Sequence, residues 1–250
     1  MNGCAARSAR KAGDDRLIQE LDSLLQEQIA YYRARASEYD EWFLRQGRFD
    51  RGPEANRRWF DQAQEVYTAL EAFRPTGRIL ELAPGTGIWT QRLLAYASDL
   101  TAVDASPEML ALCRRRVGEA HVRLILADIF AWQPDEQYDV VFFSFWLSHV
   151  PWDLFASFWA KVRACLAPDG RVFFVDSLPD PTSTAADHVL PDKGVTTMLR
   201  RLNDGREFTV VKVFHQPEDL AARLADLGWQ MTVRATENYF IYGWGTPVRG

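Results

Sequence analysis

One short stretch, residues 79–89 (ILELAPGTGIW), constrains the fold more strongly than any other part of the 250-residue chain. An apolar run carries Glu81 near its end, a turn with Gly85 and Gly87 follows, and a helical pattern then begins. The segment therefore predicts a strand, a tight turn and a helix. Glycines let a backbone approach a ligand closely, and the first turn of a helix carries free N–H donors. This turn is the first candidate ligand site.

Acidic side chains follow the next two predicted strands. Asp104 closes the apolar strand 100–103, near the spacing of about 20 residues after a glycine turn at which an acid accepts hydrogen bonds from ribose hydroxyls. The competing interpretation is an acid that is simply solvated at a strand end. Asp128 follows the strand 122–126 and is a candidate acceptor for an adenine amine, with Ile129 packing on the ring.

Strand and helix patterns alternate along the rest of the chain. The expected strands are 78–82, 100–103, 122–126, 140–143 and 171–175, then a hairpin of 195–202 and 206–214, and last 229–235 and 239–244. Helices between successive strands predict a parallel sheet that is covered on both faces. The fold class is therefore α/β, a Rossmann-like sheet of seven strands, mostly parallel, with an antiparallel last strand. Ligands of such sheets bind beyond the carboxyl ends of the strands.

The segment before the first strand has a different pattern. Residues 1–13 are small, polar and basic, which predicts a disordered tail. Residues 14–75 predict a helical lid on a single domain spanning 14–250, whose core, 76–250, holds the hairpin as an insertion at about 177–214. Tyrosines suit a lid because they have apolar bodies and polar tips. The lid candidates are Tyr31, Tyr32 and Tyr39.

Composition narrows the class of function. The net charge of −5 does not favour a nucleic-acid surface, and no apolar run is long enough to span a bilayer. The four histidines form no metal-ligand pair, so no metal is expected. The three cysteines are far apart, which predicts neither a zinc site nor a disulfide framework and favours a reducing cytoplasm: Cys4, Cys113 and Cys165. No particular oligomeric state is predicted.

The order and spacing of these motifs resemble the class I S-adenosylmethionine-dependent methyltransferases, over roughly residues 30–244. Their first motif is acid-x-Gly-x-Gly-x-Gly, and here Ala83 replaces the first glycine, a change that a turn with negative φ tolerates. A dinucleotide-dependent dehydrogenase shares the first two motifs but lacks the antiparallel seventh strand. The resemblance implies S-adenosylmethionine as cofactor, held by Glu81, Ala83, Gly85, Gly87, Trp89, Asp104, Ala105, Met109, Asp128, Ile129, Phe143, Ser144 and Tyr39.

A narrower resemblance covers residues 31–40, the end of the fourth strand through His149, and the segments 174–176, 204–206 and 211–214. These segments are similar to the phosphonate O-methyltransferases of dehydrophos biosynthesis and their relatives. The resemblance implies specialised (natural product) metabolism and a small anionic acceptor, a phosphonate or carboxylate, methylated on oxygen. The substrate contacts would be Tyr31, Tyr32, Trp146, His149, Arg206 and Lys212.

The predicted chemistry follows from the charge of such an acceptor. An acid is already ionised near neutral pH, so the site needs cations rather than a general base. Strand parity places Arg206 and Lys212 on one face of the hairpin, whereas Arg200 and Arg201 are weaker candidates because one of them must point away. His149 then acts at the active site as a substrate positioner. Two alternatives stay open: a neutral hydroxyl or amine acceptor with His149 as base, and a non-catalytic module that binds S-adenosylmethionine.

Overall fold

The computed structural model describes residues 2–118, 122–192 and 194–249, with side chains from Asp15 onward. Within these residues, seven strands form one sheet in the order β3-β2-β1-β4-β5-β9-β8. The chain starts at the central strand β1, builds outward to β3, and then returns to add β4 on the other side of β1. This reversal between β1 and β4 is the switch point at which parallel sheets bind ligands. Within this sheet, β9 runs opposite to the other strands and pairs antiparallel with both β5 and β8.

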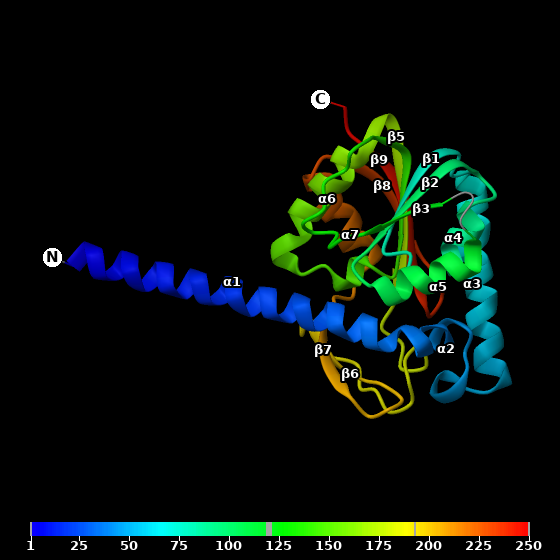
Figure 1. Cartoon of the computed structure of the whole chain (residues 1–250), viewed down its shortest axis with the longest axis horizontal. Coiled ribbons are helices and arrows are strands. Elements are labelled where there is room, and N and C mark those ends of the chain that lie inside the picture. The colour runs from blue at the N-terminus through cyan, green and yellow to red at the C-terminus, as the bar shows by residue number, and fades with distance from the viewer. Residues whose placement is uncertain (1, 119–121, 193, 250) are drawn as a thin grey trace.

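The elements occupy nearly the whole chain (Figure 1). The strands are β1 Gly77–Leu82, β2 Ala97–Asp104, β3 Val122–Leu126, β4 Tyr138–Ser144, β5 Leu166–Ser177, β6 Thr197–Arg201, β7 Glu207–Val211, β8 Trp229–Ala235 and β9 Phe240–Pro247. The α-helices are α1 Asn2–Arg35, α2 Tyr39–Phe43, α3 Pro53–Phe73, α4 Ile88–Leu93, α5 Pro107–Val117, α6 Trp152–Cys165 and α7 Pro217–Asp226. The mostly parallel seven-stranded sheet predicted from the sequence is confirmed.

Two apolar cores cover the two faces of the sheet. On one face, α6 and α7 pack through Phe158, Trp159 and Leu224. On the other face, α3 and α4 pack through Trp59 and Trp89, among other side chains. Both faces of the parallel strands are therefore buried, which explains why their sequences are apolar without alternation.

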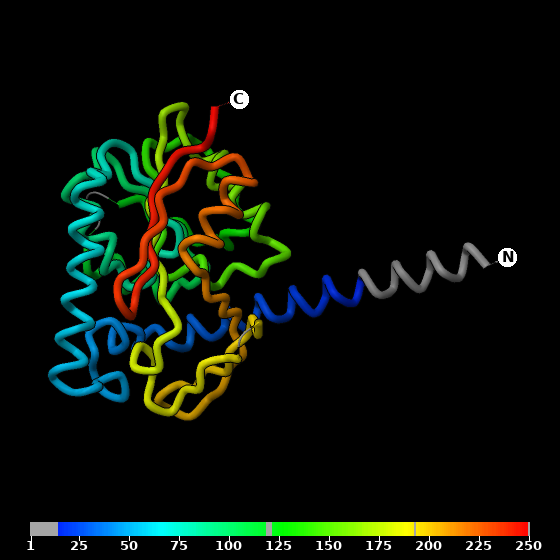
Figure 2. The backbone as a smooth tube through the Cα atoms, turned by 180° about the vertical axis from the view of Figure 1, so that it is seen from behind, coloured from blue at the N-terminus to red at the C-terminus, as the bar shows by residue number. Residues whose placement is uncertain are grey.

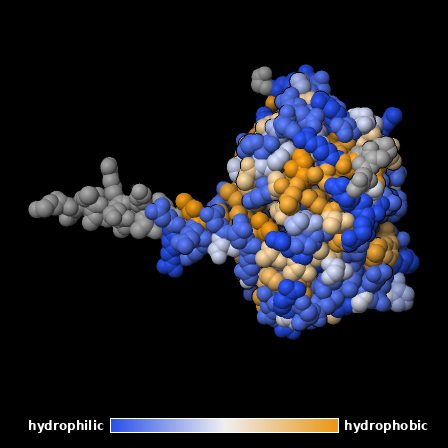
Figure 3. Space-filling view, in the orientation of Figure 1, coloured by the Kyte–Doolittle hydropathy of each residue, from blue (hydrophilic) through white to orange (hydrophobic). Residues whose placement is uncertain are grey.

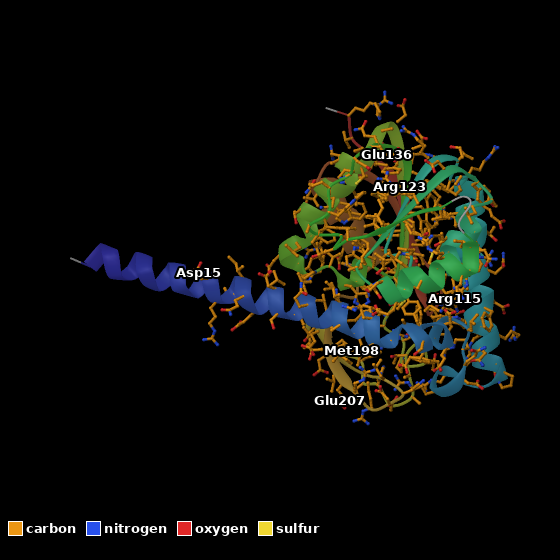
Figure 4. The ribbon with its side chains drawn as sticks, viewed as in Figure 1. Asp15, Arg115, Arg123, Glu136, Met198 and Glu207 are labelled. Atoms are coloured by element: carbon orange, nitrogen blue, oxygen red, sulfur yellow. The ribbon has the colours of Figure 1, made fainter. Side chains whose placement is uncertain are left out.

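A second layer closes the carboxyl ends of the strands. Helices α1 and α2 and the separate hairpin of β6 and β7 lie below the sheet in Figure 1, and Figure 2 shows the same arrangement from behind. In Figure 4, Met198 and Glu207 mark the hairpin below α1, whereas Arg123 and Glu136 lie at the opposite end of the sheet. Helices α1 and α2 of the lid and the inserted hairpin of β6 and β7 therefore meet over the carboxyl ends of the strands.

Side chains of α1 complete the free edge of β7. The backbone N–H of Thr209 donates to Glu27 (2.6 Å), and that of Val211 donates to Gln28 (3.1 Å). The amide nitrogen of Gln28 also donates to the carbonyl oxygen of His149, 3.2 Å away. An exposed strand edge is a liability for pairing with other chains, and α1 removes it here. The lid is therefore held by buried hydrogen bonds as well as by apolar packing.

The described part of α1 projects beyond the body of the protein, and Figure 4 places Asp15 on this projection. Its surface is mostly hydrophilic on the face drawn in Figure 3, although Leu17 and Ile18 are exposed. The helix is assigned from Asn2, whereas the sequence predicts a helical start at residue 14. Described side chains begin only at Asp15, so the tail at 1–13 stays a prediction. No helix within the described residues combines the length and apolarity needed to cross a membrane.

We expect Gln28→Ala to destabilise the protein by about 1–3 kcal/mol, because it leaves a buried N–H and a buried carbonyl without partners. The measurement is the free energy of unfolding in urea. Gln26→Ala is the matched control, since Gln26 is an exposed residue on the same helix. Equal stabilities of the two variants would contradict the role assigned to Gln28.

Candidate active site

Two adjacent cavities lie between the lid and the carboxyl ends of the strands. The first, the glycine-turn cavity, holds about 500 Å³ of empty space, including the part open to solvent, and is bounded by Gly85 and Asp104 on the sheet side and by Gln28 and Ile29 from α1. The second, the arginine cavity, holds about 490 Å³ on the same measure and is bounded by residues of α1, of the hairpin and of the segment after β5. Four aromatic side chains line both cavities, namely Tyr32, Tyr39, Phe145 and His149.

The turn after β1 is built from left-handed backbone. Gly85 and Gly87 have φ of 56° and 85°, and a Cβ atom at Gly87 would lie 2.9 Å from Sγ of Cys113. Ala83 has φ of 55°, so the expectation of a negative φ at this position is wrong. A left-handed conformation costs an alanine roughly 1–2 kcal/mol, which packing on the core offsets here. The turn therefore keeps its shape without its first glycine.

Asp104 is fixed at the end of β2 by backbone donors. The N–H groups of Gly85 and Ser106 donate to its two carboxylate oxygens, over 3.2 Å and 2.9 Å. Burial raises the pKa of Asp104 to about 6, against the opposing effect of these hydrogen bonds. A carboxylate held in this way has lone pairs left for the hydroxyl groups of a ligand. Glu81 lies beneath the turn, where burial raises its pKa to about 8.

The arginine cavity gathers three cations from three separate parts of the chain. They are Arg35 at the end of α1, Arg200 on β6 and Lys212 just after β7. Nζ of Lys212 donates to the hydroxyls of Ser148 (2.8 Å) and Ser177 (2.6 Å) and lies 3.7 Å from a carboxylate oxygen of Asp176. Lys212 is thus paired, and burial lowers its pKa to about 8.

The guanidinium groups of Arg200 and Arg35 have different neighbours. Arg200 donates to the hydroxyl of Thr184 (2.7 Å) and approaches Nδ1 of His188 (3.1 Å). Arg35 is buried, and its guanidinium carbon lies 5.0 Å from the centre of the Tyr39 ring. Among the described residues, neither arginine forms an ion pair with a carboxylate. A buried cation without a counter-charge is costly, so this cavity favours an anionic ligand.

His149 is held in one tautomer at the junction of the two cavities. Its Nδ1 lies 2.6 Å from the carbonyl oxygen of Val211, which only accepts, so Nδ1 carries the proton. Its Nε2 then accepts from the hydroxyl of Tyr32, 2.6 Å away. Burial and the nearby Lys212 lower the pKa of His149 to about 3. The ring is therefore neutral, and its lone pair is already occupied by a phenol.

Phe145 adds a strained residue to the same junction. It follows β4 with φ of 52°, and its N–H donates to the carbonyl oxygen of Val175 over 2.7 Å. Its ring stands edge-on to that of Trp42, with centroids 4.6 Å apart. Backbone strain in a bulky residue persists only where the surroundings impose it, and such residues gather at functional sites. The strain aims an aromatic ring between the two cavities.

The structure brings many of the sequence-predicted residues to the glycine-turn cavity. Those on its wall are Tyr32, Tyr39, Ala83, Gly85, Asp104, Ala105, Met109, Ser144, Trp146 and His149. Those behind or beside the wall are Glu81, Gly87, Trp89, Asp128, Ile129 and Phe143. Asp128 instead accepts from the N–H of Phe130 (2.9 Å), and Gly87 shapes the turn from within. For this second group, contact with the cofactor stays a prediction.

The structure places two of the predicted substrate contacts, Arg206 and Tyr31, away from both cavities. Arg206 lies in the hairpin turn beyond the paired residues of β7, where it forms an exposed ion pair with Asp204 at 2.8 Å. Strand parity correctly put Lys212 on the inner side, but it does not say how far the cavity extends along the hairpin. Tyr31 is buried against Met198 and Val210 and lines neither cavity.

Sequence reasoning also missed residues that line the two cavities. Arg200 was the weaker candidate, and its neighbour Arg201 points out to an ion pair with Glu207. Arg35 lies four residues before Tyr39 in the predicted lid, and that proximity to the tyrosines was the available signal. The other missed residues are Gln28, Ile29, Trp42, Ser106, Ser177, Ser183, Thr184, Leu190 and Phe214. Among the described residues, no group of three or more potential ligands is placed to hold a metal ion.

Comparison with known proteins identifies the class of protein. Residues 79–170 match the family model described as a methyltransferase domain. The DhpI-SAH and DhpI-SAM-HEP complexes are 39% identical to this chain, cover 91% and 90% of it and 98% of their own chains, and give TM-scores of 0.74 and 0.75. The ubiquinone biosynthesis O-methyltransferase of Xanthomonas campestris pv. campestris (strain B100) is 29% identical over 72% of this chain and 74% of its own.

The chain belongs to the class I S-adenosylmethionine-dependent methyltransferases. It is an enzyme, and its cofactor is S-adenosylmethionine. The residues on the wall of the glycine-turn cavity fit this cofactor, because they offer a left-handed turn for close approach and an acid for a ribose diol. The sulfonium supplies the methyl group, and the protein's task is to bind, orient and exclude water.

We expect Asp104→Ala to weaken binding of S-adenosylmethionine by about 1–3 kcal/mol, because ribose hydroxyls would lose a charged acceptor. Affinity of the wild-type enzyme should also fall as the pH drops through about 6, where the carboxylate becomes protonated. Isothermal calorimetry measures both effects. Asp99→Ala is the control, since Asp99 is exposed at the other end of β2. Wild-type affinity in Asp104→Ala would remove this residue from the cofactor site.

Proposed function

We propose that the enzyme methylates an oxygen atom of a small anionic acceptor, a phosphonate or a carboxylate, in specialised metabolism. The acceptor would bind in the arginine cavity, and S-adenosylmethionine would bind in the glycine-turn cavity with Asp104 on its ribose. The methyl group would pass between them at the aromatic junction of Tyr32, Tyr39, Phe145 and His149. Aromatic faces suit this position because they attract a sulfonium cation and exclude water.

The observation that carries this proposal is the pair of guanidinium groups without carboxylate partners, next to Lys212. An acid group would supply the missing counter-charge, and a guanidinium binds carboxylates and phosphonates through two parallel hydrogen bonds. The polar side chains of Ser177, Ser183 and Thr184 line the same space, although the hydroxyls of Ser177 and Ser183 already donate to Asp176 and to the carbonyl oxygen of Asp180. A neutral acceptor would leave the cations uncompensated.

The reaction needs no proton transfer when the acceptor is an anion. S-adenosylmethionine, held at the wall of the glycine-turn cavity, would supply the methyl group from its sulfonium and leave as a neutral thioether. The acceptor oxygen would form the new carbon–oxygen bond as the carbon–sulfur bond breaks, and the acceptor would lose one negative charge. The protein contributes mainly position and a dry site, for which effective concentrations are large.

His149 fits the role of a positioning residue better than that of a base. A general base works best with a pKa near the operating pH, whereas burial lowers the pKa of His149 to about 3. Its free nitrogen is also occupied by the hydroxyl of Tyr32. We propose that His149 orients Tyr32 against the reacting groups. This disfavours the alternative of a neutral hydroxyl or amine acceptor deprotonated by His149.

One relative supports oxygen as the acceptor atom. The matched Xanthomonas protein is a ubiquinone biosynthesis O-methyltransferase. The sequence resemblance to phosphonate O-methyltransferases points to the same chemistry. Among oxygen acceptors, the positive charge of the arginine cavity favours an acid over a neutral hydroxyl.

Arg200→Ala should lower kcat/KM for an anionic acceptor by about 30-fold or more, because the acid would lose a partly buried cationic partner worth about 2–5 kcal/mol. Steady-state methyl transfer to ethylphosphonate and to propionate from labelled donor measures this. Binding of S-adenosylmethionine should be unchanged. Arg206→Ala is the matched control from the same hairpin, because its ion pair is exposed. Similar losses in both variants would argue against the arginine cavity as the acceptor site.

The pH profile separates the two mechanisms. We expect kcat/KM for the acid to be level around neutral pH and to fall above about 8, because Lys212 is charged below its pKa and neutral above it. Lys212→Arg should keep the charge and lose this decline. We expect titration of His149 to cause no further change in kcat/KM, because its imidazole stays neutral over this pH range. The profile is measured with propionate and saturating S-adenosylmethionine, so that protonation of Asp104 near pH 6 does not limit the rate. Under these conditions, a rate that rises with an apparent pKa near 6.5, the ordinary value of histidine, would instead indicate a histidine base.

A further inference from the structure

A large open groove lies beside the arginine cavity. Its volume of about 1290 Å³ exceeds that of either cavity above. It is bounded by the start of α6, by α7, and by the chain segments on either side of the hairpin. Its apolar surface comes from Trp152, Val195, Val213, Phe214 and Leu220. The proposed function above does not use this groove.

Phe214 lines both the groove and the arginine cavity. The extended segment that leaves β7 places Lys212 in the arginine cavity, and the next residue, Val213, in the groove. Phe214 is only half-buried, and its ring centre lies 5.0 Å from Nζ of Lys212. The segment after β5 also contributes to both spaces: Leu190 lines the arginine cavity, and Pro191 lines the groove. The side chain of Phe214 therefore lies between the cations of the arginine cavity and the larger groove.

The groove holds an exposed aromatic platform. Trp152 is 39% exposed, and its indole lies under the guanidinium of Arg223 at 4.5 Å. His215 supports it edge-on, with ring centres 5.3 Å apart. The same indole continues into a neighbouring hollow between α6 and α7. A tryptophan fixed in this way presents a rigid surface to an aromatic or apolar group.

The charges at the rim of the groove do not select an ion. Among the described residues, the rim carries two acids, Asp192 and Asp219, and one base, Arg223, so it offers no cluster of cations for a second anion. His215 is buried, and burial lowers its pKa to about 4, so it adds no charge near neutral pH. The ligand chemistry that fits best is therefore an uncharged apolar or aromatic group.

We infer that the groove is a subsite for the tail of the acceptor, so that the preferred substrate is an acid carrying an aromatic or apolar tail rather than a bare small acid. The acid group binds among the arginines, the chain passes Phe214, and the tail lies on Trp152. This inference rests on the proposed function and deepens it by naming the substrate class.

The test compares alkylphosphonates of increasing methylene number with and without a terminal phenyl group. With the wild-type enzyme, we expect a phenyl group at one linker length to raise kcat/KM about tenfold over the plain chain, mainly through KM. Trp152→Ala should remove this gain and leave turnover of ethylphosphonate unchanged. Phe60→Ala is the matched control, because Phe60 is 42% exposed on α3, away from both cavities and the groove.

A second readout avoids turnover. Calorimetry on the enzyme saturated with S-adenosylhomocysteine should show tighter binding of the phenyl-bearing phosphonate, and this advantage should disappear in Trp152→Ala. Unchanged affinity for S-adenosylhomocysteine in that variant establishes that it is folded. Equal kcat/KM and equal affinity for plain and phenyl-bearing chains would overturn the subsite and leave acid methylation intact. Failure of every phosphonate and carboxylate would overturn the proposed function itself.

Discussion

The most demanding feature of this structure is positive charge held away from water without a carboxylate in ion-pair contact among the described residues. Arg35 is buried and Arg200 is half-buried, and neither forms an ion pair with a described carboxylate. Such a charge is tolerated only because aromatic faces, hydroxyls and a packed lid surround it. Binding of the anionic acceptor that we propose would recover the free energy needed to keep the charge there. The lid, the hairpin and the aromatic junction can all be understood as the support for this arrangement.

The lid is part of the site rather than a cover for it. Helix α1 supplies Gln28 and Ile29 to one cavity and Arg35 to the other, and its Tyr32 borders both. The same helix completes the edge of β7, so the positions of the hairpin and the lid depend on each other. A change that loosens α1 would therefore alter both cavities. This coupling suits a reaction that requires both ligands in a dry, shared space.

Local strain is concentrated where the sheet meets the cavities. Ala83 and Phe145 both adopt left-handed backbone conformations, one after β1 and the other after β4. These strands flank the switch point, where the chain must turn sharply to expose backbone and side chains to ligands. Hydrogen bonds to neighbouring strands hold both residues in place, through the carbonyls of Val103 and Val175. The strain is thus imposed by the same sheet that positions the site.

The sequence by itself determined the sheet, the glycine turn and the acid on β2. These features depend on local spacing, because strand length, turn residues and the acid at a strand end are all set by neighbours along the chain. Strand parity also predicted that Arg200 and Arg201 point in opposite directions, whereas the burial of Lys212 is seen only in the folded protein.

Only the tertiary structure decided which cations form the site. Parity gives the face of a strand but not where along it a cavity lies, so Arg206 was placed at a cavity that ends well before the hairpin turn. Arg35 comes from α1, far in sequence from Arg200 and Lys212. Its place in the arginine cavity depends on how α1 packs across β7. Such long-range contacts are set by the packing of whole elements, which no local pattern records. The tautomer of His149 has the same origin, because its two partners, Tyr32 and Val211, meet only in the folded protein.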